Sequence, residues 1–261
     1  MMLLILAFIF GTVVGSFLNV CVYRIPEGQS IVVPASHCRA CKKPIAFYDN
    51  IPLISFLVLK GKCRHCGSPL SVQYPLVELI SGLLAAARVL KWGAGYIAAV
   101  WFLFCAALIV VTFIDLKHQI IPDVISLPGI ACGVLLSLVL DGPGLRSSLI
   151  GAALGGGSLF LIRCVYYAVT RQEGMGLGDV KLLAMMGAFL GWKSILFIIM
   201  AASFSGALLG IAVMIIKKKN SRYAIPFGPF LSLGAVCYLF CGQEMINWYL
   251  NLHQLIQEHI G

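Results

Sequence analysis

Residues 95–114 read GYIAAVWFLFCAALIVVTFI, a run of twenty residues without one charge, and Asp115 follows directly. About 20 helical residues are needed to cross the hydrocarbon core of a bilayer, which is about 30 Å thick. The run therefore predicts a transmembrane helix. A carboxylate at the end of such a helix is costly to keep ionised without a partner or water, so Asp115 is a candidate functional residue.

The whole chain has the composition of a membrane protein. Of its 261 residues 60% are hydrophobic and only 11% are charged, whereas soluble domains are about 25% charged. In the strands of a membrane β-barrel, apolar and polar residues alternate, and the apolar runs of this chain lack that alternation. The shortest run, the sixth, could form a helical hairpin with the seventh. We expect an all-α polytopic membrane protein with about eight transmembrane helices, at residues 1–23, 74–90, 95–114, 124–140, 147–170, 180–192, 194–216 and 226–250.

The positive charges predict how these helices are oriented. Cytoplasmic loops of membrane proteins are enriched in Lys and Arg. Of the 19 Lys and Arg residues, 14 lie in the gaps 24–73, 115–123, 171–179 with Lys181, and 217–222. Four lie toward the opposite side, namely Arg88, Lys91, Arg146 and Lys193, and Arg163 lies inside a run. We expect the first set to face the cytoplasm and the amino terminus to lie outside. The net charge of +9 then suits anionic lipid headgroups, and the sequence contains no nucleic-acid-binding module.

The longest polar segment, residues 24–73, carries two Cys-x-x-Cys pairs. Cys38 and Cys41 form the first pair, and Cys63 and Cys66 form the second after a 21-residue spacer. Two pairs at this separation are typical of a tetrahedral Zn²⁺ site, and stable disulfides are disfavoured in a cytoplasmic loop. Four thiolates would close the coordination sphere, so the predicted role of the zinc is structural. Redox pairs or unligated thiols are the alternative.

These features predict three regions. Residues 1–23 form the first transmembrane helix, residues 24–73 the cytoplasmic zinc-binding loop, and residues 74–261 the helical bundle that carries the reactive site. Within the loop, residues 45–59 are apolar but interrupted by polar residues and proline, and we expect them to lie along the membrane surface. The remaining cysteines lie in the apolar runs and are interpreted as small core residues: Cys21, Cys105, Cys132, Cys164, Cys237 and Cys241.

A second aspartate, Asp179, ends the glycine-rich stretch GMGLGD at residues 174–179, where the sixth apolar run begins. The predicted topology puts Asp179 on the same side of the membrane as Asp115. Two carboxylates that approach closely share a proton, because both cannot ionise comfortably. Such a pair can hydrolyse a peptide bond, with the ionised carboxyl taking a proton from water and the protonated one donating to the carbonyl oxygen. Asp115 and Asp179 are therefore the candidate catalytic residues.

Other roles remain open for these carboxylates. Asp179 could cap the helix that follows it, and Asp123 could cap the fourth helix, since Asp is favoured at helix N-caps. Asp115 could pair with a neighbouring basic residue. A carboxylate metal site built from Asp115, Asp123 and Asp179 is a further alternative. The HExxH motif of metalloproteases and the GxSxG motif of serine hydrolases are absent from the sequence.

Two further features bear on a site. The three glycines of residues 174–178 would let another backbone pass close to Asp179, as a peptide substrate would require. Glu78 lies in the second apolar run, ten residues from Arg88, which is too far along a helix for a direct pair. We expect Glu78 to hydrogen-bond a neighbouring helix or loop, or else to belong to a cofactor or substrate site.

In these motifs the chain resembles the bacterial type IV prepilin peptidases, a family of membrane aspartic proteases of the GxGD type that includes N-methyltransferases. The resemblance extends from residue 15 to residue 229, nearly the full length, with the motifs in the family's order. It rests on GSFLNVCVYRIP at residues 15–26, the two Cys-x-x-Cys pairs, QYPLVE at 73–78, Asp115 with IPD at 121–123, GLGD at 176–179 with Lys181, and PFGP at 226–229.

This resemblance implies that Asp115 and Asp179 are the catalytic pair of an endopeptidase in the bacterial inner membrane. Its substrates would be prepilins or pseudopilins, cut after a glycine at the cytoplasmic face. The cysteine tetrad goes with the bifunctional form, which then methylates the new amino terminus from S-adenosylmethionine. No glycine-rich strand-to-helix fingerprint for that cofactor is present, so its binding residues are unknown, and the oligomeric state is not predicted.

A different class of function also fits the residues taken alone. A proton- or cation-coupled transporter could use Asp115 and Asp179 as a relay across the membrane. The paired broken helices typical of many transporters are not evident in the two halves of the sequence.

Overall fold

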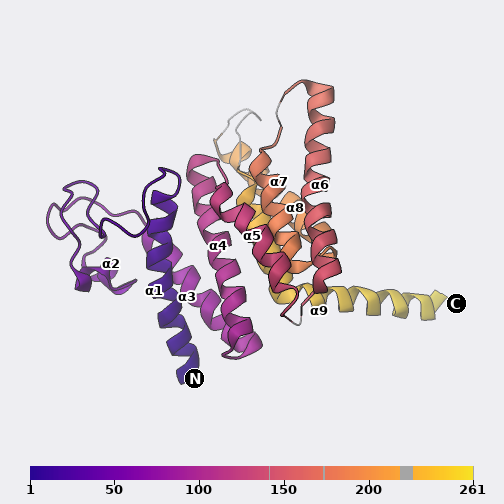
Figure 1. The fold of residues 1–261 in the computed structure, drawn as a ribbon, viewed down its shortest axis with the longest axis horizontal. Coiled ribbons are helices and arrows are strands. Elements are labelled where there is room, and N and C mark those ends of the chain that lie inside the picture. The colour runs from indigo at the N-terminus through magenta and orange to yellow at the C-terminus, as the bar shows by residue number, and fades with distance from the viewer. Residues whose placement is uncertain (141, 173, 218–225, 261) are drawn as a thin grey trace. The chain divides into compact units, whose positions relative to one another are not determined.

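The fold is built from helices and the loops between them (Figure 1). The computed structural model describes residues 1–140, 142–172, 174–217 and 226–260. Within them it contains two isolated β-bridges and no β-strand, so the predicted all-α class is confirmed. The helices are α1 (Met2–Arg24), the 3₁₀ turn η1 (Phe47–Asn50), α2 (Ile54–Val58), α3 (Gln73–Trp92), α4 (Tyr96–His118), α5 (Asp123–Leu136), α6 (Gly144–Thr170), α7 (Leu177–Leu190), α8 (Lys193–Lys217) and α9 (Gly228–Ile260).

Five of the described helices are long and apolar enough to cross a membrane, namely α1, α3, α4, α6 and α8. Helices α5 and α7 have only 14 residues each. At 1.5 Å per residue this is about 21 Å of helix, less than the roughly 30 Å of a hydrocarbon core. Each of the eight predicted runs corresponds to a helix, but the count of eight transmembrane spans is not confirmed.

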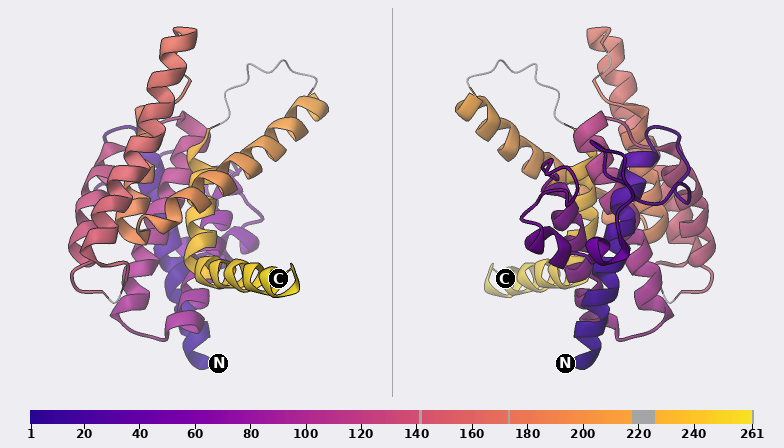
Figure 2. Two further views of the ribbon diagram at one scale, coloured as in Figure 1. Left: turned by 90° about the vertical axis from the view of Figure 1, so that its right-hand side faces the viewer. Right: turned by 90° about the vertical axis from the view of Figure 1, so that its left-hand side faces the viewer.

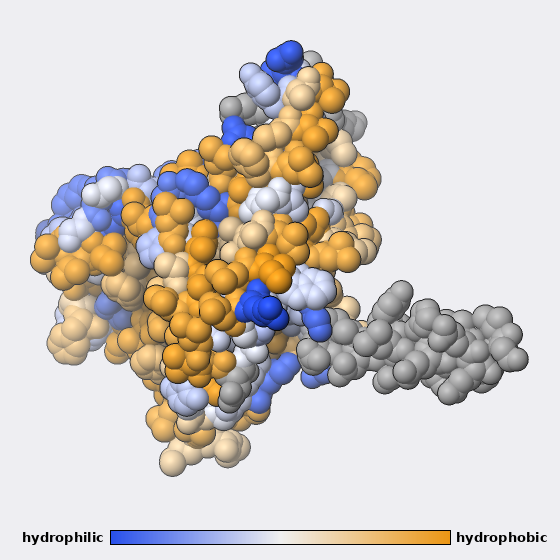
Figure 3. Space-filling view, turned by 45° about the vertical axis from the view of Figure 1, so that its right-hand side comes forward, coloured by the Kyte–Doolittle hydropathy of each residue, from blue (hydrophilic) through white to orange (hydrophobic). Residues whose placement is uncertain are grey.

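Apolar side chains cover the outer faces of the long helices. On α6, Leu149, Phe160 and Leu161 are each at least half exposed. Figure 3 shows apolar residues, in orange, over much of the visible surface. Patches of this extent are rare on soluble monomers and suit contact with lipid tails. The protein is thus a multi-pass membrane protein.

The chain divides into two compact units, Met1–His118 and Gln119–Gly261. In the first unit, α1 lies beside α3 (Figure 1), and small residues form their contact. A Cβ added at Gly11 would lie 2.6 Å from the carbonyl oxygen of Ser81, and one at Gly15 would also meet the backbone of α3. The two helices therefore pack almost backbone to backbone, as small-residue interfaces allow within membranes.

Arg88 joins α3 to α4 inside the first unit. Its side chain is 1% exposed, and Nη2 donates to the Trp101 carbonyl oxygen at 2.8 Å and to the Cys105 sulfur at 3.2 Å. The guanidinium also lies over the Trp92 ring, 4.8 Å from the ring centroid. Hydrogen bonds and a cation–π contact thus offset part of the cost of burying this charge.

In the second unit, α7 packs against both α5 and α6. A Cβ added at Gly151 of α6 would fall on the carbonyl oxygen of Gly187, and one at Gly187 would fall on that of Gly151. The Ser148 hydroxyl donates to the carbonyl oxygen of Ala188 at 2.6 Å. This packing holds α7 in place and with it the first turn, which contains Asp179.

A matched pair of substitutions in α6 tests this helix contact. Gly151→Ala should lower the stability of the detergent-purified protein by about 1–3 kcal/mol, because the added methyl has no room. Gly157→Ala, in the same helix, should leave stability unchanged or raise it by up to about 1 kcal/mol, because its Cβ meets no atom within 4 Å and Ala favours helix. Thermal unfolding measures both changes. Equal melting temperatures for the two variants would contradict the packing described.

The loop between α1 and α3 has almost no core of its own. Of residues 25–72, all of which the structure describes, only Cys38 and Ser55 are buried. In Figure 2 (right) this segment, in dark purple, lies beside α1. In its apolar stretch, 45–59, Phe47 is 86% and Leu57 is 74% exposed. Burial of apolar surface therefore contributes little to folding the loop, and another interaction must hold it.

The cysteines outside the loop differ in burial. Cys21 and Cys105 are buried, as expected, but the four in the second unit are exposed, so the prediction of core positions is wrong for Cys132, Cys164, Cys237 and Cys241. The lipid-facing side of a transmembrane helix is as apolar as its core-facing side. Residue type alone therefore does not separate the two environments.

Candidate functional site

The two Cys-x-x-Cys pairs form two turns of the same construction. In the first, the Lys42 amide donates to the Cys38 carbonyl oxygen at 2.8 Å, and the Cys38 amide donates to that of Lys43 at 2.9 Å. In the second, the Gly67 amide donates to the Cys63 carbonyl oxygen and the Cys63 amide donates to that of Ser68, both at 2.9 Å. We call these turns knuckle 1 (residues 36–45) and knuckle 2 (residues 61–70).

The likeness of the knuckles extends beyond the cysteines. The Ile45 amide donates to the Ser36 carbonyl oxygen, and the Leu70 amide donates to that of Gly61. Pro44 and Pro69 occupy equivalent bridge positions. This repeat was not predicted, although its signal is present in the sequence as Cys-Arg-x-Cys-x-x-Pro at residues 38–44 and again at 63–69.

The knuckles bring all four sulfurs together. The ligand atoms of Cys38, Cys41, Cys63 and Cys66 lie within 4.8 Å of one another, and the Cys38 and Cys66 sulfurs are 3.8 Å apart. In a regular tetrahedron with Zn–S bonds of about 2.3 Å, neighbouring sulfurs are about 3.8 Å apart. A hydrogen bond from the Cys41 backbone amide is the main cause that lowers the pKa of the Cys38 thiol to about 6, whereas the neighbouring Cys38 and Cys66 sulfurs help raise the pKa of the Cys41 thiol to about 11. The cluster thus fits a closed zinc site.

At one equivalent position the two knuckles have the same backbone conformation but different residues, which gives a test of the repeat. Lys42 (φ 59°) and Gly67 (φ 68°) both adopt the left-handed conformation that disfavours side chains. Gly67→Ala should weaken zinc retention and Lys42→Gly should strengthen it, each by about 1 kcal/mol or roughly fivefold. Competition with a chromogenic chelator measures the change. A Lys42→Gly protein that loses zinc as readily as Gly67→Ala would argue against equivalent turns.

The loop is fastened to the helices of the first unit by polar and aromatic contacts. The Arg39 guanidinium of knuckle 1 lies over the Tyr23 ring, with Cζ 3.0 Å from the centroid. Tyr23 in turn stacks on Tyr74, with centroids 5.7 Å apart. The Leu53 amide donates to Oε2 of Glu78 at 2.8 Å. Glu78 thus makes the hydrogen bond to a loop that the sequence suggested.

Within the loop, the spacer is tied to knuckle 2 by an ion pair. The Arg64 guanidinium donates to both carboxylate oxygens of Asp49, at 2.6 and 2.7 Å. These hydrogen bonds lower the pKa of the Asp49 carboxyl. A two-point arginine–carboxylate contact fixes orientation as well as distance, so it holds the spacer in one arrangement beside the sulfurs.

Asp115 lies in the last turn of α4, in the first unit, and is 5% exposed. The Nζ of Lys117, two residues further on, lies 4.4 Å from the centroid of the Tyr23 ring. Because Arg39 also lies over this ring, one tyrosine contacts both knuckle 1 and the end of α4. The candidate catalytic aspartate therefore lies at a helix end that the loop contacts through Tyr23.

Asp179 lies in the second unit, in the first turn of α7. The helix begins at Leu177 with Gly176 as its N-cap, so Asp179 does not have the capping role that was left open as an alternative. The glycine at position 178 enters the helix where the sequence suggested a loop. A carboxylate in the first turn still faces the positive end of the helix dipole, which favours its ionised form by about 0.3–1 kcal/mol.

Asp123 is the first residue of α5, and Pro122 is the N-cap. The predicted capping role of Asp123 is therefore wrong. Its carboxylate oxygens both accept hydrogen bonds from the Lys181 ammonium, each at 2.8 Å. The residue instead connects the start of α5 to the start of α7 within the second unit.

The glycines around the start of α7 contact other parts of the second unit. A Cβ at Gly178 would lie 2.8 Å from the Cβ of Ile121, and one at Gly174 would lie 2.6 Å from the Tyr166 ring. A Cβ at Gly176, by contrast, would meet no atom closer than 3.6 Å. Two of the three glycines, Gly174 and Gly178, are thus required for close packing within the second unit.

The fold and the site define a class: a multi-pass helical membrane protein with a four-cysteine knuckle pair. Two family models match the sequence of this chain. The bacterial peptidase A24 N-terminal domain matches residues 9–92, and the type IV leader peptidase family matches residues 102–211. The first range contains all four cysteines of the cluster, and the second contains Asp115 and Asp179.

Curated relatives agree with these matches. The prepilin leader peptidase/N-methyltransferase of Aeromonas hydrophila is 35% identical over 269 residues, covering 94% of this chain and 93% of the relative. The protein of the same name from Burkholderia pseudomallei (strain 1026b) is 34% identical, and the match covers 92% of this chain and 86% of that protein. The one from Myxococcus xanthus (strain DK1622) is 42% identical, and the match covers 80% of this chain and 62% of that protein. No solved structure matches the chain. The chain belongs to the type IV leader peptidase family, as its motifs suggested.

Proposed function

We propose that this protein is an endopeptidase of the bacterial inner membrane that removes the leader peptide of type IV prepilins or pseudopilins and then methylates the new amino terminus. The observation that carries the proposal is the similarity, over more than nine-tenths of both chains, to a prepilin leader peptidase/N-methyltransferase. No observation favours a transporter: both family models are those of peptidases.

Asp115 and Asp179 are the proposed catalytic pair. With one proton between them, the ionised carboxyl takes a proton from water as the oxygen attacks the scissile carbonyl, and the protonated carboxyl donates to the carbonyl oxygen. Collapse of the tetrahedral intermediate then breaks the C–N bond. The amine leaves with the proton that the first carboxyl took from water, and a hydroxyl of the intermediate returns its proton to the second carboxyl. The location of both residues within the range of the peptidase family model supports this assignment.

The four cysteines are proposed to bind one structural Zn²⁺ in the loop, which supplies a cross-link between the knuckles and no reacting group. The near-tetrahedral spacing of the sulfurs and the lack of a core in the loop support this role. We further propose that the loop, residues 24–73, and both aspartates face the cytoplasm, with the amino terminus outside, since 14 of the 19 Lys and Arg residues belong to the gaps on that side.

Co-expression with a prepilin tests the function, with leader removal and amino-terminal methylation scored separately by intact-mass spectrometry. We expect the leader to be removed after a glycine and the new amino terminus to gain one methyl group, supplied by S-adenosylmethionine. A prepilin that keeps its leader in the presence of the folded, zinc-loaded protein would contradict the proposal.

A further inference from the structure

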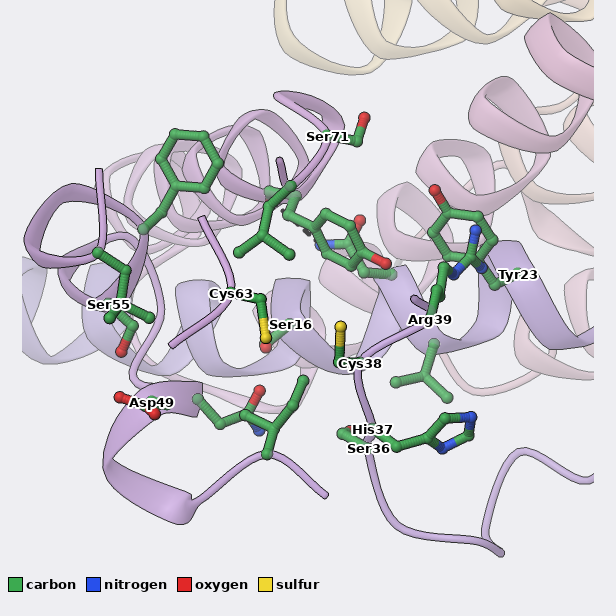
Figure 4. Close-up of a pocket in the computed structure, with 18 of the residues that line it drawn as sticks. Ser16, Tyr23, Ser36, His37, Cys38, Arg39, Asp49, Ser55, Cys63 and Ser71 are labelled. Atoms are coloured by element: carbon green, nitrogen blue, oxygen red, sulfur yellow. Dashed lines mark hydrogen bonds between the residues drawn. The ribbon is translucent and has the colours of Figure 1, made fainter. Parts of the chain in front are cut away.

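A cavity of about 640 Å³ lies within the first unit, between the zinc loop and the ends of α1 and α3. Figure 4 shows side chains of α1, including Ser16 and Tyr23, facing those of knuckle 1, including Arg39, and of the spacer, including Asp49. Cavities of about 300–1,000 Å³ are typical of sites for small molecules and cofactors. The size and position therefore suit a ligand much smaller than a protein.

One wall of the cavity contains a buried amide oxygen that lacks a donor. Asn19 is 2% exposed, and its Nδ2 donates to the Tyr74 carbonyl oxygen at 3.1 Å. This bond orients the amide, yet Oδ1 accepts no hydrogen bond from any residue that the structure describes. A buried acceptor of this kind is costly unless something donates to it, so a ligand with an N–H or O–H group would be favoured here.

The same walls combine negative, positive and aromatic groups. Glu78 is 7% exposed, and its Oε2 is held by the Leu53 amide. Arg39 and the stacked rings of Tyr23 and Tyr74 also line the cavity. A carboxylate attracts a cation, a guanidinium attracts a carboxylate, and the aromatic rings give the cavity an apolar side. The complementary ligand therefore has a cation, a carboxylate and an apolar planar part.

We propose that this cavity binds the methyl donor, a sulfonium nucleoside joined to an amino acid. S-Adenosylmethionine has a cationic sulfonium and ammonium, a carboxylate, a planar base, and N–H and O–H donors for the Asn19 oxygen. The inference rests on the proposed methylation activity and extends it by locating the cofactor. It also explains why no strand-to-helix fingerprint is found in the sequence, since the walls are helix ends and a zinc-folded loop.

Two variants separate the contributions of the walls. Asn19→Leu removes the unpaired acceptor, and Glu78→Gln removes the negative charge while keeping an oxygen that can accept from the Leu53 amide. Each should weaken binding of S-adenosylmethionine, measured without a prepilin so that no methyl group is transferred, by about 5- to 150-fold in titration calorimetry of the full-length, zinc-loaded protein. The control is Ser205→Ala in α8. Among the described residues its hydroxyl donates only to the carbonyl oxygens of Ala201 and Ala202, so the variant should bind as the wild type does.

Folding is checked by zinc content and thermal unfolding. If Asn19→Leu does not fold, Glu78→Gln and a second measurement decide the question. Ultraviolet cross-linking of methyl-labelled S-adenosylmethionine to the wild type should label peptides within residues 16–78. Unchanged affinity in a folded Glu78→Gln protein, or label confined to residues 119–261, overturns the assignment of the cavity.

Leader removal and methylation by the same wild-type preparation distinguish this inference from the proposed function. A wild type that trims and methylates a prepilin but carries the cross-link elsewhere overturns the cavity alone. A wild type that neither trims nor methylates overturns the proposed function.

Discussion

Asp179→Asn should lower the rate of leader removal by roughly 10²–10⁴-fold, the usual contribution of a positioned acid or base. The loss corresponds to about 3–5 kcal/mol of barrier. Asparagine matches aspartate in size but cannot exchange the proton that the reaction requires. Loss of the favourable charge in the first turn of α7 costs only about 0.3–1 kcal/mol of stability. The variant should therefore be folded but inactive, and Asp115→Asn should behave in the same way.

Asp123→Asn is the matched control for these variants. Asp123 also begins a helix of the second unit, but its carboxylate is exposed and paired with Lys181. An exposed ion pair of this kind is worth about 0–1 kcal/mol, so cleavage should stay within a fewfold of the wild type. Initial rates on a purified prepilin compare the three variants. An Asp123→Asn protein as inactive as Asp179→Asn would instead favour a metal site built from three carboxylates.

Cys63→Ser should release the zinc and unfold the loop while the helices remain folded. Zinc contributes about 10–16 kcal/mol to the folding of small zinc-finger peptides. The loop has almost no buried side chains to replace that contribution. We expect zinc per protein to fall well below one and trypsin to cut within residues 25–72. Elemental analysis and limited proteolysis measure the two effects.

Cys164→Ser provides the control for the zinc experiment, because this cysteine is exposed in the second unit and far from the loop in sequence. It should retain the zinc and resist proteolysis as the wild type does. A Cys63→Ser protein with full zinc content and an intact loop would show that the cluster is not the structural centre of this segment.

The fold class follows from the sequence because lipid imposes a composition. Long uncharged runs such as residues 95–114 have one stable solution in a bilayer, a helix that satisfies its own backbone. The lengths of the shorter helices do not follow in the same way. Helix α7 buries residues such as Leu182 and Met186 against protein, which requires the same apolar side chains as contact with lipid. Composition therefore gave the elements but not the number of spans.

The cysteine cluster could be predicted from the sequence, whereas the contacts that hold the loop and the starts of α5 and α7 could not. Cysteine spacing identified the tetrad, because two Cys-x-x-Cys pairs have few other uses. The bond from Leu53 to Glu78 and the Tyr23 contacts with Arg39 and Lys117 could not be predicted. They join segments that are distant in sequence, and no local pattern encodes such pairings. The starts of α5 and α7 were misplaced because Asp123 and Asp179 were considered as N-caps, whereas Pro122 and Gly176 hold those positions. In a sequence, a proline or glycine that serves as an N-cap looks the same as one in a loop.

The central claim is that Asp115 and Asp179 act as one catalytic pair, and a double-mutant cycle on the rate of leader removal tests it most directly. If both carboxylates serve the same step, the Asp115→Asn/Asp179→Asn protein should lose no more activity than the more damaged single variant, because removing either member already abolishes that step. Losses that multiply, so that the double variant shows the product of the two single effects, would mean independent roles and contradict the account.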